Sequence, residues 1–148
     1  MCLIAIDTDV LAIHHIFTWD ERWKINEEFL LKVVKPATTI HNLLELASLI
    51  IRALRNTELA IKIFKYYASS SRWEIIFPPE FTGWERFADE IFNYINRGMS
   101  YADSLIAWTV EEYNDIEAFI TWNLRDFRGK LKIAVYSPEE WLMKMKHK

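Results

Sequence analysis

The sequence is poor in the residues that mark several large classes of protein. Its single cysteine, Cys2, excludes an internal disulfide and favours a reducing compartment such as the cytoplasm. Three glycines and four prolines are too few for a disordered chain or for a β-sandwich with many turns. No uncharged run approaches the roughly 18 residues that a membrane span needs. Asp7 and Asp9 interrupt the apolar N-terminus, so we also expect no export signal and no membrane partner.

Excess positive charge is absent as well. The net charge of −3 excludes broad electrostatic binding of nucleic acid, so any such contact must be local, through a metal ion or a small basic cluster. What the sequence does have is apolar side chains, with 51% hydrophobic residues and seven tryptophans among 148 residues. This composition predicts one globular domain over residues 1–148, with apolar area to bury in a core, a groove or a subunit interface.

Short apolar segments alternate with longer amphipathic ones along the chain. Strands are predicted at 3–6, 73–77, 117–121 and 131–135. Helices are predicted at 10–17, 26–34, 39–55, 58–68, 81–96, 101–113 and from 138 onward. We interpret Pro36 as the end of the second helix. The alternation predicts an α/β fold, a three-layer α/β/α sandwich around a mostly parallel sheet.

Polar residues follow two of the predicted strands directly. Asp7 follows the first strand, and Thr121 ends a later strand that is followed by Asn123 and Asp126. Ligands of parallel α/β sheets bind beyond the carboxyl ends of the strands, so these side chains are expected to meet at one edge. Taken alone, Asp126 is most simply a loop residue.

Three further acids each have a structural interpretation beside a functional one. Glu45 lies inside an apolar helical segment, where it is either a site residue or the partner of Arg52 or a lysine. Asp103 follows Ser100 at the spacing of a capping box, and an acid in the first turn suits the helix dipole. Asp9 taken alone is a helix N-cap rather than a ligand.

The collective pattern favours function. Several carboxylates brought into one pocket cannot all stay ionised without a cation. Oxygen ligands suit Mg²⁺ or Mn²⁺, whereas the histidines do not have the spacing of a zinc site. The carboxylates that could share such a pocket include Asp7, Glu45, Asp103 and Asp126.

The order of motifs resembles the PIN-domain family, especially the VapC-type ribonuclease toxins. The segments that carry the resemblance, over nearly the whole chain, are IAIDTDVL, TTIHNLLELA, GMSYADSLIAWTVEE, FITWNLRDF and IAVYSPEEW. The resemblance implies a compact α/β/α domain that holds Mg²⁺ or Mn²⁺ and cleaves RNA in the cytoplasm. It also implies an antitoxin protein as a partner. The apolar area of Trp19 and Trp23 suits a dimer or an antitoxin groove, although core burial is the default, and we expect a second copy of the chain as a partner.

Carried over residue by residue, the resemblance assigns metal binding to Asp7, Glu45 and Asp103. It also makes these three residues and Asp126 the predicted catalytic acids. Asn123 stands where many members of the family carry an acid, so Asp126 either supplies the missing charge or holds the loop. The absence of an acid at position 123 weakens the prediction of a second metal ion more than the prediction of the first.

The remaining assignments support the site. Thr121 supplies a hydroxyl, and Asp9 either binds metal-coordinated water or caps its helix. Arg125 and Arg128 either contact RNA phosphates or belong to a solvated loop. Trp122 either stacks on a base or, as we favour, packs in the protein.

Two other functions compete with the ribonuclease. A haloacid-dehalogenase-type phosphatase shares an Asp-x-Asp loop after a strand, but the chain after Thr121 has no room for its later acidic motif. A degenerate PIN-like domain that only binds RNA or protein is kept open by Asn123 in place of an acid. A purely structural α/β module would bind no divalent ion.

Overall fold

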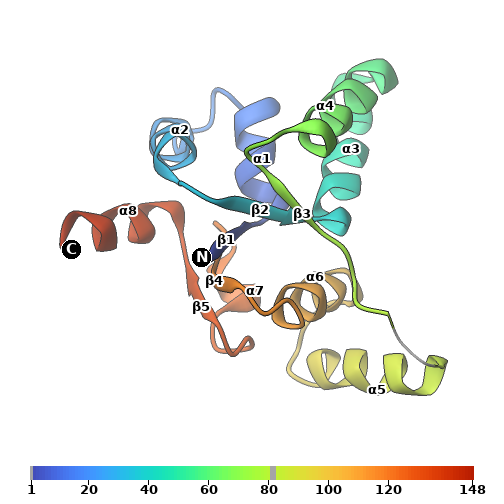
Figure 1. Cartoon of the computed structure of the whole chain (residues 1–148). Helices are drawn as coiled ribbons and strands as arrows, with labels where there is room; N and C mark the ends of the chain where they lie inside the picture. The colour runs from blue at the N-terminus through green and yellow to red at the C-terminus, as the bar shows by residue number, and fades with distance from the viewer. Residues whose placement is uncertain (1, 81–82) are drawn as a thin grey trace.

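A five-stranded, all-parallel sheet in the order β3-β2-β1-β4-β5 forms the centre of the molecule (Figure 1). The computed structural model describes residues 2–80 and 83–148. The strands are β1 (Leu3–Ile6), β2 (Pro36–Thr39), β3 (Glu74–Ile76), β4 (Ile116–Ile120) and β5 (Ala134–Tyr136). Chain order and spatial order differ, because β1 lies between β2 and β4.

Helices cover both faces of the sheet, which confirms the predicted three-layer arrangement (Figure 1). One face carries α1 (Thr8–His15), α2 (Trp23–Lys32), α3 (Ile40–Leu54), α4 (Thr57–Ser69) and α8 (Pro138–Lys146). The other carries α5 (Trp84–Ile95), α6 (Tyr101–Glu111) and α7 (Leu124–Phe127). In the part of the chain that the structure describes, no helix combines the length and apolar character needed to cross a bilayer.

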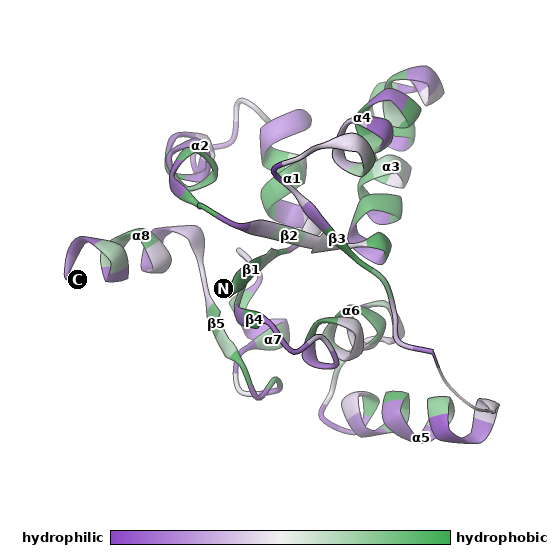
Figure 2. Ribbon diagram, in the orientation of Figure 1, coloured by the Kyte–Doolittle hydropathy of each residue, from purple (hydrophilic) through white to green (hydrophobic). Residues whose placement is uncertain are grey.

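The strands are apolar on both sides because each side faces a separate core. In β1, Ile4 and Ile6 pack into the core under α1 to α4, and Ala5 packs into the core under α5 and α6. Figure 2 shows the apolar character of β1 at the middle of the molecule. Such continuous hydrophobic strands are typical of parallel sheets.

Two elements are absent from the sequence prediction. Pro36 does not merely follow a helix but opens β2, where it pairs with Ile4 of β1. Proline is tolerated at the first residue of a strand, and four residues between two helices give too short a pattern to detect. The single turn of α7 was likewise interpreted as loop.

The other elements confirm the predicted order, with shifts at their ends. The last strand begins at Ala134 rather than at residue 131, and α5 begins at Trp84. The first two residues of the predicted helix 81–96 lie outside the described residues. Ser137 and Glu140 form the capping box that opens α8.

Candidate active site

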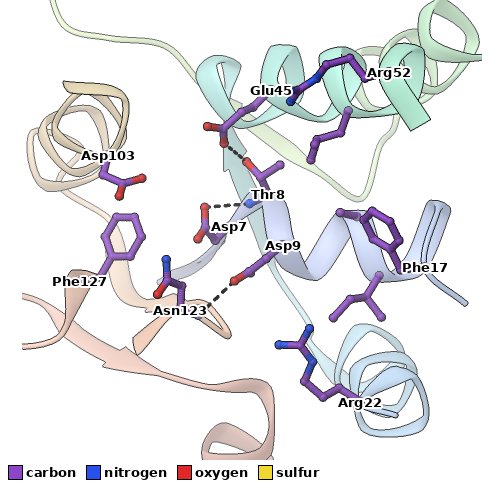
Figure 3. Close-up of a pocket in the computed structure, with 13 residues that line it drawn as sticks. Asp7, Thr8, Asp9, Phe17, Arg22, Glu45, Arg52, Asp103, Asn123 and Phe127 are labelled. Atoms are coloured by element: carbon purple, nitrogen blue, oxygen red, sulfur yellow. Dashed lines mark hydrogen bonds between the residues drawn. The ribbon is translucent and has the colours of Figure 1, made fainter. Parts of the chain in front are cut away.

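A cavity of about 360 Å³ opens at the carboxyl edge of the sheet (Figure 3). Four carboxylates line it: Asp7 and Asp9 at the start of α1, Glu45 on α3 and Asp103 on α6. These residues are far apart in the sequence and meet because three helices start at or pass this edge. The meeting of acids that the sequence predicted therefore occurs for three of the four predicted catalytic residues.

Asp7 is buried and held by donors on both carboxylate oxygens. Its Oδ1 accepts hydrogen bonds from the Thr8 backbone N–H at 2.8 Å and from Asn42 Nδ2 at 3.0 Å. Its Oδ2 accepts from the Thr121 hydroxyl at 2.8 Å. Asp7 is also the N-cap of α1, so the same residue starts the helix and faces the cavity.

Asp9 does not cap α1, which corrects one of its two sequence interpretations. The helix begins at Thr8, one residue before Asp9, and Asp7 takes the cap. Instead, Asp9 Oδ2 accepts from the backbone N–H groups of Trp122 at 3.0 Å and Asn123 at 3.1 Å. It also accepts from the Thr121 hydroxyl at 3.1 Å, so Thr121 bridges Asp7 and Asp9. We call Asp7 and Asp9 the fixed pair.

The other oxygen of Asp9 has no such partner. Oδ1 is buried and accepts no hydrogen bond from the residues that the structure describes. A buried polar atom without a partner is costly, and native structures rarely keep one without a reason such as an ion or water. The orphaned oxygen therefore indicates a ligand position beside Asp9.

Glu45 and Asp103, which we call the facing acids, lie opposite the fixed pair and are half-buried (Figure 3). Glu45 accepts a short hydrogen bond from the Thr8 hydroxyl, and no ion pair to Arg52 occurs among the described residues. The alternative of a Glu45–Arg52 pair is therefore wrong. Ser100 caps α6 through the Asp103 backbone N–H, while the Asp103 carboxylate lines the cavity.

Crowding and burial shift the acids toward protonation. Burial, reinforced by the charge of Asp9, raises the pKa of Asp7 well above its ordinary value. Burial also raises the pKa of Asp9, although the N–H of Trp122 and the Thr121 hydroxyl oppose the shift. The pKa of Asp103 is raised by burial and by the charges of Asp126 and Glu45. Carboxylates that resist ionisation together are typical of a site that a cation completes.

The fourth predicted acid has a different place. Asp126 is not among the residues that line the cavity, whereas Asn123 is. The Asn123 side-chain amide donates to Asp126 Oδ2 at 2.5 Å. Asp126 is therefore linked to the cavity by its hydrogen bond with the Asn123 side chain.

The predicted RNA contacts lie apart from the cavity wall. Arg125 is exposed on α7. Arg128 donates to the Val135 carbonyl at 3.0 Å and to the Glu140 carboxylate. Trp122 packs against the core under α1 and donates from Nε1 to Asn26 Oδ1 at 2.7 Å, as we favoured.

The donor set fits a hard divalent cation. All of the acids supply oxygen ligands, Asp9 keeps a buried oxygen free, and the cavity contains several acids whose pKa is raised. In their present positions, no three His, Cys, Asp or Glu side chains within residues 2–80 and 83–148 stand close enough to ligate one ion together. Ligation would therefore need the half-buried facing acids to turn toward the fixed pair.

Sequence reasoning missed three residues of the site. Asn42 is fully buried and donates from Nδ2 to both Asp7 and the Thr8 hydroxyl. Its signal was a polar residue three positions after the N-cap Thr39, to which it is joined by a reciprocal capping box. Arg22 and Arg52 also line the cavity, and nothing in their local sequence distinguishes them from other surface arginines.

Comparison with known proteins gives a structural likeness without a sequence match. No protein-family model matches the chain, and no curated protein matches it. A Mycobacterium tuberculosis VapC toxin that cleaves the sarcin-ricin loop is similar at a TM-score of 0.58 and 17% identity, over 78% of this chain and 86% of that one.

Two toxin–antitoxin complexes are also similar. The VapBC-1 complex of nontypeable Haemophilus influenzae contains a chain with a TM-score of 0.64 and 17% identity, over 93% of this chain and 98% of that one. The VapBC2 complex of Rickettsia felis, bound to promoter DNA, gives 0.60 and 20%, over 91% and 99%. The chain therefore has the fold of the PIN-domain VapC toxins, as its motif order suggested.

Proposed function

We propose that this protein is an Mg²⁺- or Mn²⁺-dependent endoribonuclease that hydrolyses phosphodiester bonds at the carboxylate-lined cavity. The observation that carries the proposal is the buried Asp9 Oδ1, left without a donor beside Asp7 and opposite the facing acids. The fold shared with VapC toxins, one of which cleaves the sarcin-ricin loop, supports the same reaction class.

In this proposal the fixed pair and the facing acids hold the ion. Asp7, Glu45 and Asp103 are the principal ligands, and Asp9 offers its unpartnered oxygen. A bound Mg²⁺ or Mn²⁺ makes water nucleophilic near neutral pH and stabilises negative charge on the phosphate and the leaving oxygen.

The surrounding polar residues keep the ligands in place. Thr121 donates one proton and lies within hydrogen-bonding distance of both Asp7 and Asp9, so it fixes their spacing. Asn42 holds Asp7 from the other side. Asn123, oriented by Asp126, presents an amide to the cavity, and we propose that it positions substrate or water rather than replacing an acid.

We further propose that the ribonuclease is the toxin of a VapBC-type pair, acting on RNA in the cytoplasm and inhibited by an antitoxin protein. The similar structures include VapC toxins bound to their antitoxins, which supports a protein partner. We also propose a homodimer. Large exposed apolar side chains on α5, Trp84 at 73% and Phe92 at 64% exposure, would be covered by a second copy.

The test is cleavage of a mixed RNA pool by purified protein with Mn²⁺ or Mg²⁺. We expect cleavage that EDTA stops and that Asp7→Asn slows about 1,000-fold. The matched control is Asp89→Asn, an exposed acid on α5 outside the cavity, which should cleave as the wild type does. Intact RNA with folded, metal-supplied wild-type protein would contradict the proposal.

One observation favours a second candidate, a PIN-like scaffold that binds RNA without cleaving it. The cavity wall has an amide, Asn123, at the position where the resemblance leads us to expect an acid. This candidate predicts RNA binding that Asp7→Asn leaves intact and no metal-dependent cleavage, so the same assay separates the two.

A further inference from the structure

The cavity continues beyond the acids into a region of different chemistry. On the side away from Asp103, its wall is made of apolar side chains from α1, from the segment that follows α1 and from α3, together with two arginines (Figure 3). The residues that form this region are Ile13, Phe17, Arg22, Leu49 and Arg52. We call it the basic end of the cavity.

Arg52 reaches the cavity on the same face of α3 as Glu45. Positions 45, 49 and 52 are four and then three residues apart, which places them on one side of a helix. No carboxylate pairs with Arg52 in the part of the chain that the structure describes. An exposed guanidinium at a cavity wall without an acidic partner is suited to an anionic ligand, because it presents five donors in a planar fork.

Arg22 approaches the basic end from the N-cap of α2 and is held in place. Its Nε and Nη2 donate to the Asp20 carboxylate at 2.9 Å each, and its guanidinium lies 5.4 Å from the centre of the Trp122 ring. Asp20 uses two of the five N–H groups, which leaves the others for a ligand. This side chain is therefore oriented toward the cavity before any ligand arrives.

Phe17 supplies the apolar part of the basic end. Its ring is partly exposed, lies near the Trp19 ring at 5.7 Å between centroids, and appears between the two arginines in Figure 3. A nucleobase can stack on such a ring without sequence preference. A nucleotide in the interior of a duplex could not, because neighbouring bases cover both faces of its base.

We propose that the basic end binds the nucleotide next to the scissile phosphate, with its base against Phe17 and its flanking phosphate on Arg52 and Arg22. The inference rests on the proposed ribonuclease function and deepens it, because it assigns Phe17, Arg22 and Arg52, which lie outside the acidic group, to binding of the substrate. The acids and the arginines then act on neighbouring phosphates of one RNA strand. The acids lie at the phosphodiester bond that is cleaved, and the arginines bind the phosphate next to it.

The test measures binding rather than cleavage, so that it stays independent of the reaction. In an Asp7→Asn background with EDTA, fluorescence anisotropy gives Kd for a labelled single-stranded RNA hexamer and for the same sequence in the interior of a longer duplex. We expect the single strand to bind at least tenfold more tightly. Arg52→Gln should weaken its binding about tenfold, as loss of a charged hydrogen bond does. The slope of log Kd against log salt concentration should fall by about 0.7 for the lost phosphate contact.

Two further variants separate the parts of the proposal. Phe17→Leu should weaken binding of the single strand about fivefold without changing the salt slope, because stacking carries no charge. Arg86→Gln, which removes an exposed arginine of α5 outside this cavity, should leave both Kd and slope unchanged. Arg22→Gln, measured beside its thermal unfolding, should reproduce the Arg52→Gln result.

Several results would overturn the inference. Equal binding of the single strand and the duplex, no measurable binding, or a Kd unchanged by both arginine substitutions would each do so. A Kd unchanged by both arginine substitutions would indicate that the basic end binds a protein partner instead of RNA. Because cleavage is assayed separately, an active wild-type enzyme with unchanged RNA binding in these variants would overturn the inference and leave the proposed function intact.

Discussion

The two sides of the acidic cavity hold their carboxylates in different ways. The fixed pair, Asp7 and Asp9, is buried in a network of six hydrogen-bond contacts. Five residues supply them, Thr8, Asn42, Thr121, Trp122 and Asn123, and Thr121 bridges both acids. Glu45 and Asp103 are half-buried, and within residues 2–80 and 83–148 the one side-chain donor to Glu45 is the Thr8 hydroxyl. The fixed pair is thus oriented before an ion binds, whereas the facing acids keep the freedom to adjust to it. Preorganised ligands of this kind favour binding because less ordering remains to be done.

The comparison predicts unequal losses of activity. Asp7→Asn should lower the RNA cleavage rate about 1,000-fold, because it removes a ligand that is already in position and with it several kcal/mol of transition-state stabilisation. Asp103→Asn should lower the rate about 100-fold. Single-turnover cleavage with Mn²⁺ measures both. Equal losses would show that the two sides contribute alike, despite their different burial.

The orphaned oxygen of Asp9 predicts that metal stabilises the fold. Mn²⁺ at 100 times its Kd should raise the free energy of unfolding by about 2.7 kcal/mol, since only the folded chain holds the acids together. Thermal unfolding with increasing Mn²⁺ measures this. Asp9→Asn should lose most of the effect, and Asp89→Asn should keep all of it. Undiminished stabilisation in Asp9→Asn would place the ion elsewhere.

Without metal, the fixed pair should destabilise the protein at neutral pH. Because burial and Asp9 raise the pKa of Asp7, ionisation of Asp7 costs more in the folded state than in the unfolded chain. Asp7→Asn should therefore raise the free energy of unfolding by about 1 to 2 kcal/mol. The asparagine also fits, because Thr121 can accept from its amide while donating to Asp9. Urea unfolding in EDTA measures the change, and a lower midpoint for Asp7→Asn would contradict it.

The same effect has a defined pH dependence. The stabilisation that the protonated Asp7 gives is complete below its ordinary pKa of 3.8 and is lost as pH rises through the raised pKa of the folded state. The stability advantage of Asp7→Asn should therefore grow as pH rises above 3.8. His15 acts in the opposite direction, because burial lowers its pKa to about 4, but both proteins carry it and the difference removes it. If the stability advantage of Asp7→Asn over the wild type became smaller as pH rises, the predicted direction of the pH dependence would be wrong.

The smallest effect is expected at Asp126, which lies outside the cavity wall. Asp126→Asn should lower the cleavage rate twofold to tenfold, because it weakens one hydrogen bond that orients Asn123, worth about 1 kcal/mol. The same assay that compares Asp7 with Asp103 measures it. A loss as large as that of Asp103→Asn would make Asp126 a ligand in its own right.

The sequence predicted the layers of the fold, and three of its four predicted catalytic acids line the cavity, because these features depend on local patterns. Alternating apolar segments give the sheet and helices, and acids after strands or inside apolar helices stand out individually. The resemblance in motif order then assigned Asp7, Glu45 and Asp103 to one metal site. The strand β2 was not predicted, because four residues that begin with proline are too few to show the alternating pattern of a strand.

The remainder of the site depends on contacts between distant segments. The sequence left Asp9 as either a helix cap or a residue that binds metal-coordinated water. Its carboxylate in fact accepts hydrogen bonds from backbone N–H groups more than 110 residues away. Asn42, Arg22 and Arg52 acquire their places only when α1, α2 and α3 pack around one cavity. No local pattern distinguishes such residues from ordinary surface or capping residues.

The central claim, that the fixed pair and the facing acids together hold a divalent cation, is tested most directly by calorimetric titration of metal-free protein with Mn²⁺. We predict saturable binding to the wild type that Asp7→Asn abolishes and Asp89→Asn preserves. No binding to the folded wild type, or binding that Asp7→Asn leaves unchanged, would contradict the claim.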